Sequence, residues 1–268
     1  MSNYLDAYLI TGDTEFLDAV HDIATYLTTS PMQSSSGGFF SSEDADSVYS
    51  LGDTDKREGA FYVWTATEFI DILGPADAEI AARFWNVKAS GNVSPEHDAH
   101  DELQNQNVLA VSLTVESLAE EFDLTTEETQ SSLDRCRRKL LEHREKQRPR
   151  PALDDKIIVA WNGLAISSLS RVSAAIGSVD PEKANVYLQC AIRAAEFIKK
   201  ELYSASEGTL TRVYREGPGN SPAFSDDYAF LVTALIDLYE ATFDDAWLEW
   251  ADALQSQSFY ETMGMRKC

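Results

Sequence analysis

Hydrophobic residues recur along the chain in pairs of helical segments joined by short turns. Leu-Asp-Ala-Tyr at residues 5–8 is followed by Thr-x-Asp and Phe16-Leu17, and Ile-Asp-Leu-Tyr at residues 236–239 is followed by Thr-x-Asp and Trp247-Leu248. The offset is constant, because 239 − 8 = 242 − 11 = 248 − 17 = 231. An apolar helix, an Asp that caps the next helix and a second helix are expected at both ends of the chain.

A third helical hairpin is predicted between these two. Residues 157–176 are apolar on nearly every side and end at Gly177, and Pro181 opens an amphipathic helix that continues to Leu202. A helix buried all round followed by a half-buried helix predicts an inner and an outer layer. The expected buried face of the second helix comprises Tyr187, Leu188, Ala191, Ala195, Ile198 and Leu202.

Two further hairpins are predicted over residues 66–87 and 114–147, where Pro149 and Pro151 end the last helix. Short β-like segments at 37–40, 61–64 and 210–214 connect the hairpins. We predict an all-α fold: a single domain over 1–268, an (α/α)6-toroid-like ring with short β-hairpins at one rim. Because a full ring needs six hairpins and five are recognisable, we expect an incomplete ring; the alternative is a five-hairpin protein.

Composition and charge narrow the classes of partner. A hydrophobic fraction of 44% and an aromatic fraction of 10% are typical of a folded protein with a sizeable core. The net charge of -23 repels phosphate backbones and anionic lipids, so neither nucleic acid nor a membrane is an expected partner. The acids are spread along the chain, which indicates halophilic adaptation; an acidic face for a cationic partner is the alternative.

The cysteines and the N-terminus indicate the cellular compartment in which the protein is expected. Cys136, Cys190 and Cys268 form no C-x-x-C motif and no even framework, which favours a reducing cytoplasm. The N-terminus has no basic region, and the longest apolar stretch, residues 229–236, is far shorter than a membrane span. We therefore expect a cytoplasmic protein without a targeting or transmembrane segment.

The first candidate for chemistry is the segment at residues 37–47, Gly-Gly-Phe-Phe-Ser-Ser-Glu-Asp-Ala-Asp-Ser. Its three carboxylates, Glu43, Asp44 and Asp46, stand within four positions. Crowded carboxylates raise one another's pKa, which makes general acids available near neutral pH. A solvated acidic loop is the alternative.

Two more acidic segments precede predicted inner helices. Asp154-Asp155-Lys156 stands shortly before Trp161-Asn162, and Ser-Asp-Asp-Tyr at residues 225–228 opens another apolar helix. Helix capping explains one Asp per helix but not paired acids beside Trp and Tyr, a combination that sugar sites use for stacking and hydrogen bonding. If the ring forms, the three segments converge on one rim.

These segments define the candidate site. One carboxylate of an acid/base pair is Asp226 or Asp227, and the other is Glu43, Asp44 or Asp154. A stacking platform and further substrate contacts are assigned to Trp64, Trp161, Tyr228, Tyr62, Asp46, Asp155, Lys156 and Asn162.

No metal or cofactor is expected. Residues 97–102, His-Asp-Ala-His-Asp-Glu, contain metal-ligand types, but they lack cysteine and helical i, i+4 spacing and lie in a long polar segment. Glycine-rich turns at Gly12, Gly52 and Gly74 lack a phosphate-loop lysine.

Several motifs together resemble the thioredoxin-domain family that includes spermatogenesis-associated protein 20. They are the segment at 37–47, Phe-Tyr-Val-Trp-Thr from Phe61, Arg148-Pro149 followed by Asp-Asp-Lys and Trp-Asn-Gly-Leu, and Asp-Asp-Tyr-Ala-Phe-Leu from Asp226. The resemblance implies a toroid of the six-hairpin glycosidase type, similar to N-acylglucosamine 2-epimerases, beside a thioredoxin-like domain that this chain lacks. It also implies a truncated middle portion, and the charge pattern suggests a haloarchaeal member.

Two classes of function follow. The first is a sugar-processing enzyme that binds a carbohydrate; hydrolysis by two opposed carboxylates is favoured over epimerisation, because the histidines lie outside the three acidic segments. The second is a non-catalytic toroid that binds a glycan or peptide or serves as a scaffold beside a thioredoxin domain. Carboxylates more than about 10 Å apart could not flank one glycosidic bond, which separates the two.

Overall fold

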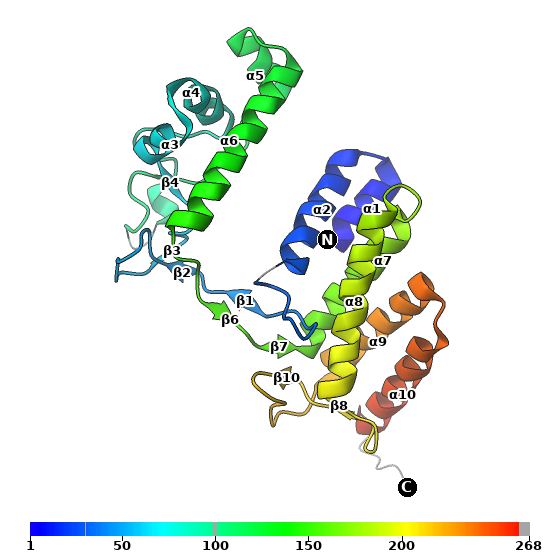
Figure 1. Cartoon of the computed structure of the whole chain (residues 1–268). Helices are drawn as coiled ribbons and strands as arrows, with labels where there is room; N and C mark the ends of the chain where they lie inside the picture. Colours follow the sequence, from blue (N-terminus) through cyan, green and yellow to red (C-terminus); the bar gives the residue numbers. More distant parts are fainter. Residues whose placement is uncertain (30, 99–100, 263–268) are drawn as a thin grey trace. The chain divides into compact units, whose positions relative to one another are not determined.

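The computed structural model describes residues 1–29, 31–98 and 101–262. Most of these residues are helical, in ten α-helices joined by strands of only two residues each (Figure 1). The prediction of an all-α fold with short β segments is confirmed. The chain divides into two compact units, unit 1 (Met1–Ser42 and Leu153–Cys268) and unit 2 (Glu43–Ala152). A single ring over residues 1–268 would involve both units and stays a prediction.

Unit 1 contains three helical hairpins, all of them predicted. They are α1 (Ser2–Thr11) with α2 (Thr14–Thr28), α7 (Val159–Ile176) with α8 (Pro181–Glu201), and α9 (Ser225–Thr242) with α10 (Asp245–Thr262). Its strands are β6 (Leu153–Asp154), β7 (Ile157–Ile158), β8 (Tyr203–Ser204), β9 (Thr209–Leu210) and β10 (Val213–Tyr214). β8 and β9 form a local hairpin, whereas β10 pairs with the distant β7.

Unit 2 contains the other two predicted hairpins. They are α3 (Ala66–Leu73) with α4 (Pro75–Phe84), and α5 (Val115–Phe122) with α6 (Thr126–Gln147). Its short elements are β2 (Asp46–Ser47), β3 (Arg57–Glu58), β4 (Trp64–Thr65), a 3-10 turn (Pro95–His97) and β5 (Gln106–Asn107), while β1 (Ser42–Glu43) crosses the boundary between the units. Among the described residues, no helix is long and apolar enough to cross a membrane.

The constant sequence offset corresponds to equivalent helix caps. Asp13 accepts a hydrogen bond from Glu15 N at 3.0 Å at the start of α2, and Asp244 accepts one from Ala246 N at 3.0 Å at the start of α10. An Asp at this position satisfies an N–H group that the first turn of a helix leaves without a partner. The repeated capped hairpin is therefore confirmed.

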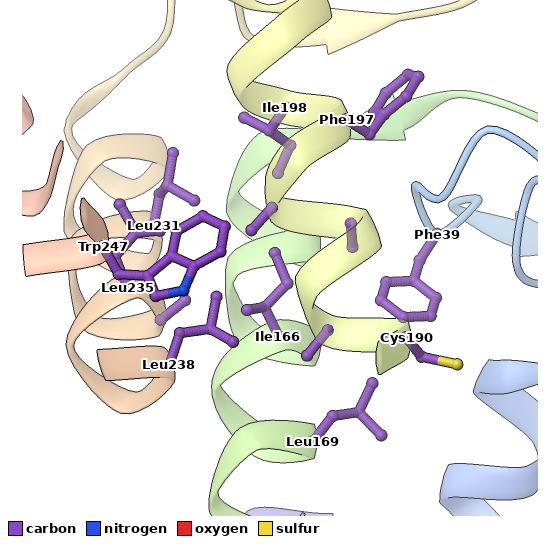
Figure 2. Close-up of a cluster of buried hydrophobic side chains, with 14 of the residues drawn as sticks. Phe39, Ile166, Leu169, Cys190, Phe197, Ile198, Leu231, Leu235, Leu238 and Trp247 are labelled. Carbon is purple, nitrogen blue, oxygen red and sulfur yellow. The ribbon is translucent and has the colours of Figure 1, made fainter. Parts of the chain in front are cut away.

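Helix α7 lies at the centre of unit 1, between α8 and α9 (Figure 1). Figure 2 shows Ile166 of α7 in one cluster of buried side chains with Leu231, Leu235 and Leu238 of α9 and Trp247 of α10. One expectation was wrong, because α7 is not buried all round. Trp161 is 52% exposed and Leu164 is 49% exposed, so one side of this apolar helix has no cover within the described residues.

Helices α7 and α9 run parallel and touch along their length. Ala160 N donates to Asp227 Oδ1 at 2.9 Å, and Ser167 Oγ donates to Asp237 Oδ2 at 2.5 Å. Between these contacts, a Cβ atom on Gly163 would lie 2.8 Å from the backbone carbon of Phe230. The absence of a side chain at Gly163 therefore allows the two helix backbones to approach at this point.

We predict that Gly163→Ala destabilises the protein by about 1–3 kcal/mol, because the added methyl must push α7 and α9 apart. Urea denaturation measures the effect. The matched control is Gly177→Ala at the C-terminal end of α7, where the backbone is right-handed helical and the nearest atom to a new Cβ is Ser173 O at 3.3 Å. Equal effects of the two substitutions would contradict this account of the helix contact.

Candidate functional site

An exposed surface follows α7 and α9, and we call it the α7/α9 strip: Trp161 and Leu164 on α7 with Asp226 and Phe230 on α9. Successive residues of an α-helix are rotated by about 100° in one sense. Trp161 is one step after the contact residue Ala160, and Asp226 is one step before the contact residue Asp227. On parallel helices these opposite steps lead to the same side, so the strip presents Trp161 and Asp226 together.

Asp227 fixes the N-terminal turns beneath this strip. Its side chain is fully buried, with Oδ1 accepting from Ala160 N and Oδ2 accepting from Phe224 N and Arg212 Nη1, each at 2.9 Å. Both oxygens are used inside the protein, and the carboxylate also favours the positive ends of both helices. The structure therefore contradicts a catalytic Asp227 and gives this residue an architectural role.

Asn162 and Tyr228 are also structural. The Asn162 side chain accepts from Phe39 N at 2.7 Å and donates to Phe39 O at 3.0 Å and Ile158 O at 2.9 Å. Tyr228 is 3% exposed, and its hydroxyl accepts from Leu210 N at 3.1 Å. The assignment of these two residues to substrate binding was wrong, because burial and backbone hydrogen bonds occupy their polar groups.

The glycines of the first motif have a packing role as well. A Cβ on Gly38 would lie 2.8 Å from Ile157 Cδ1, and one on Gly37, at φ +116°, would lie 2.5 Å from Arg193 O. Glycine is needed wherever the backbone approaches its neighbours this closely. The Gly-Gly-Phe sequence thus lets the segment dock on β7 and α8, where Phe39 is buried.

Each acid near the start of β7 has a cationic partner. Asp154 Oδ2 lies 3.0 Å from Lys156 Nζ, and Asp155 Oδ1 lies 2.6 Å from Arg215 Nε. Desolvation raises the pKa of Asp154, but hydrogen bonds from the side chain and backbone of Lys156 outweigh it, so this pKa lies below its ordinary value. Such a group is a carboxylate near neutral pH, which argues against Asp154 as a general acid. Lys156 is occupied by the same ion pair.

Arg212 links the end of the strip to the buried carboxylate below it. Its guanidinium contacts Asp227, lies 3.5 Å from Asp226 Oδ1, and stacks over the Phe224 ring with 4.7 Å to the ring centroid. Phe224 is 56% exposed, and the Asp226 side chain is 48% exposed. Aromatic faces beside an exposed carboxylate and a guanidinium are the groups that recognise a polyhydroxylated ligand.

The three acids of the first candidate segment, Glu43, Asp44 and Asp46, lie in unit 2, and crowding was predicted to raise their pKa. Instead, Arg150 Nε lies 2.5 Å from Glu43 Oε1, and Lys56 Nζ lies 3.1 Å from Asp44 Oδ2. The hydrogen bond from Asp46 N and the Lys56 ammonium lower the pKa of Asp44. The prediction is wrong for Asp44, because hydrogen bonds from the Asp46 backbone and from Lys56 favour its charged form. Asp46 is exposed within β2.

The two aromatic candidates of unit 2 differ in exposure. Tyr62 is 46% exposed, and desolvation followed by the charge of Glu43 raises its pKa. Trp64 is 2% exposed, and the Arg148 guanidinium covers its ring at 4.1 Å from the centroid. Tyr62 remains available to a ligand, whereas Trp64 belongs to the core of unit 2 and has almost no exposed surface for stacking.

Sequence reasoning missed Asp237 as a site residue. Desolvation raises its pKa, against the Ser167 hydrogen bond and the charge of Arg171, and the charge of Glu240 adds to the increase. Helix α1 also contacts α7, where Arg171 Nη2 lies 2.6 Å from Asp6 Oδ1. Asp6 and Asp237 are equivalent in the repeat, because 237 − 6 = 231. The repeat therefore marked Asp6 and Asp237 as equivalent positions, but by itself it indicated only the hairpin pattern.

Within the described part of the chain, no three His, Cys, Asp or Glu side chains gather closely enough to hold a metal ion. The segment considered as a ligand set, residues 97–102, extends over Ala99 and His100, which lie outside the described residues. Cys136 and Cys190 are buried free thiols.

Comparison with known proteins places this chain beside longer relatives. Spermatogenesis-associated protein 20 of Homo sapiens is 36% identical over 97% of this chain and 35% of its own length, and that of Mus musculus is 36% identical over 94% and 33%. An uncharacterised protein of Caenorhabditis elegans is 36% identical over 88% of this chain and 33% of its own length. The chain is homologous to these proteins and spans about a third of their length.

No protein-family model matches the chain. Among solved structures, a D-mannose isomerase aligns at 20% identity, covering 96% of this chain and 73% of that chain, with a TM-score of 0.34. A TM-score of this size carries no argument about fold or function.

We predict that Asp227→Asn costs about 3 kcal/mol of stability, because an amide cannot accept all the hydrogen bonds that the buried carboxylate accepts and Arg212 loses its buried carboxylate partner. The exposed neighbour provides the control, since Asp226→Asn should cost about 0–1 kcal/mol. Thermal unfolding of both variants measures the difference. Similar melting temperatures would contradict the architectural role of Asp227.

We also predict a pH effect at Asp237. Its folded-state pKa is raised, so the wild type binds more protons folded than unfolded and loses stability as pH rises from the ordinary Asp pKa through the raised value. Asp237→Asn removes this loss. The stability of the variant relative to the wild type should therefore increase between about pH 4 and pH 7, measured by urea denaturation. A constant difference across this range would contradict the prediction.

Proposed function

We propose that unit 1 binds a carbohydrate on the α7/α9 strip, with Trp161 as the stacking platform. The observation that carries this proposal is the 52% exposure of an indole at the first turn of an otherwise apolar helix. Burying the exposed surface of a Trp against the C–H face of a sugar is favourable, and exposed aromatic rings are used for this purpose. Asp226 on the same strip and Arg212, whose Nη1 lies 3.5 Å from Asp226 Oδ1, supply hydrogen-bond acceptors and donors.

The placement of the carboxylates supports binding over hydrolysis. Helix α9 carries Asp226 of the strip at its start and Asp237, outside the strip, further along, and 237 − 226 = 11 residues of helix correspond to about 16 Å along its axis. That separation exceeds the range of about 5–10 Å in which two carboxylates flank one glycosidic bond. Because Asp154 and Asp155 are held in ion pairs, the non-catalytic alternative is the better supported of the two functions.

An enzymatic role through Asp237 is the second candidate. A raised pKa is the kind of shift that keeps a carboxylic acid protonated for acid catalysis. Ser167 donates a hydrogen bond to Asp237, and the charge of Arg171 acts on it. Epimerisation has less support, because His21 is on α2, where its Nδ1 lies 3.0 Å from Tyr187 Oη, and His143 is in unit 2 beside Glu68. Neither of these histidines belongs to the strip.

The wider setting is also a proposal. We infer that the chain is a member of the family of spermatogenesis-associated protein 20, that its hairpins belong to an incomplete toroid, and that a thioredoxin-like domain accompanies it in full-length relatives. The identity of 36% over most of the chain supports the first inference, and the five helical hairpins support the second. A halophilic protein of haloarchaeal origin is proposed from the spread of acids and the net charge of -23, and a cytoplasmic location is proposed from the three cysteines without a C-x-x-C motif.

The binding proposal is tested on a glycan array in molar salt with wild type, Trp161→Ala and Phe243→Ala. Phe243 is a matched control, because it is an 80% exposed aromatic residue of unit 1 at the opposite end of α9. Trp161→Ala should lose about tenfold or more in affinity for the bound glycan, and Phe243→Ala should retain it.

Release of reducing sugar is measured in the same samples. Binding without turnover supports a binding domain. Turnover that Asp237→Asn abolishes would instead favour the enzymatic candidate. Equal binding by Trp161→Ala and wild type would exclude the α7/α9 strip as the glycan site.

A further inference from the structure

A hollow of about 520 Å³ lies in unit 2, apart from every residue of the α7/α9 strip. One wall is a stripe of α6 with the helical spacing Leu133, Arg137, Leu140 and Arg144. Such spacing places these side chains on one face of the helix. Trp85 and other residues of unit 2 outside α6 complete the lining. The volume falls within the range of small-molecule sites, about 300–1,000 Å³.

Most of the side chains that line this pocket are apolar, and its polar members are Gln130, Asp134, Arg137 and Arg144. Leu133 and Leu140 are each 3% exposed, and Trp64 is 2% exposed, so the floor of the pocket is the core of unit 2. At the rim, Val111 is 68% exposed and Leu141 is 47% exposed. An apolar ligand that enters would remove these rim side chains from water, which is favourable in proportion to the area covered.

Arg144 brings a positive charge to this apolar pocket. Its Nε is buried and has no hydrogen-bond partner, and its guanidinium lies over the Phe61 and Tyr62 rings at 5.1 and 5.2 Å from their centroids. Within the described part of the chain, no carboxylate forms an ion pair with it. Its neighbours differ, since Arg148 binds Glu68 at 2.8 Å and Arg150 binds Glu43 and Glu145.

This unpaired cation determines which ligand the pocket would prefer. Desolvation lowers the pKa of Arg144, which shows that the surroundings penalise its charge. A buried N–H without a partner is unfavourable, and a guanidinium binds a carboxylate through strong charge-assisted hydrogen bonds. A ligand that brings a carboxylate to Arg144 and an apolar body to the hollow would satisfy both surfaces.

We propose that this pocket binds a carboxylic acid with an apolar aromatic or aliphatic body, and that its carboxylate pairs with Arg144. The proposal is independent of carbohydrate binding, because it concerns other residues in the other unit. It also assigns Arg144 a role that differs from that of Arg148, which holds the backbone carbonyls of Ala60, Phe61 and Val63.

The probe is 2-naphthoate, and its neutral counterpart, 2-naphthamide, has the same ring system without the charge. Binding of each to the full chain is measured by isothermal titration calorimetry at constant salt. Wild type should bind 2-naphthoate about tenfold more tightly than 2-naphthamide. Equal affinities, or no binding of 2-naphthoate, would overturn the proposal.

Two matched pairs of variants locate the charge. Arg144→Gln should remove the preference for the acid, whereas Arg138→Gln, an exposed arginine of the same helix outside the pocket, should retain it. Equal loss in both variants would show a general effect of net charge and overturn the assignment.

The second pair leaves Arg144 in place in case its substitution impairs folding. Val111→Glu puts an acid at the exposed rim and should weaken 2-naphthoate binding by about threefold or more. Val111→Gln introduces a side chain of the same shape as Glu without the charge, and it should not weaken binding. Unchanged binding of 2-naphthoate by Val111→Glu would place the ligand elsewhere.

Discussion

The close parallel contact between α7 and α9 is the constraint on which unit 1 depends. Gly163 removes the side chain that would separate the two backbones, and Asp227 joins both N-terminal turns through hydrogen bonds from Ala160 and Phe224. A buried carboxylate is tolerated only because each oxygen is paired. This contact sets the register that places Trp161 and Asp226 on the same side of the helix pair.

The high content of acids in this chain does not by itself raise the pKa of the candidate carboxyl groups. Lys and Arg number only 22 against 45 Asp and Glu, yet Asp44, Asp154 and Asp155 each form an ion pair with a cation. Hydrogen bonds from the Asp46 backbone and Lys56 lower the pKa of Asp44. Desolvation of Asp154 is outweighed by hydrogen bonds from Lys156, which lower its pKa, whereas desolvation raises the pKa of Asp237. Local environment, and not the density of acids, therefore decides which carboxyl group could donate a proton.

Unit 2 shows how similar residues acquire separate roles. Arg148 is 6% exposed, donates to three backbone carbonyls, pairs with Glu68 and covers Trp64. Arg144, one helical turn earlier, has no carboxylate partner among the described residues and borders the apolar hollow. Arg148 therefore satisfies polar groups inside the unit, whereas, in the described part of the unit, the positive charge of Arg144 has no carboxylate partner beside the hollow.

The sequence by itself determined the helical hairpins, because apolar periodicity, capping Asp residues and helix-ending Gly and Pro are local signals. It also contained the 231-residue offset that makes Asp6 and Asp237 equivalent. Only the tertiary structure decided which motif residues face solvent. Asp226 and Asp227 are adjacent in sequence, but one step of about 100° around α9 exposes the first and buries the second against α7. Neighbours in space, which no local pattern specifies, thus separate the exposed carboxylate from the buried one that joins the two helices.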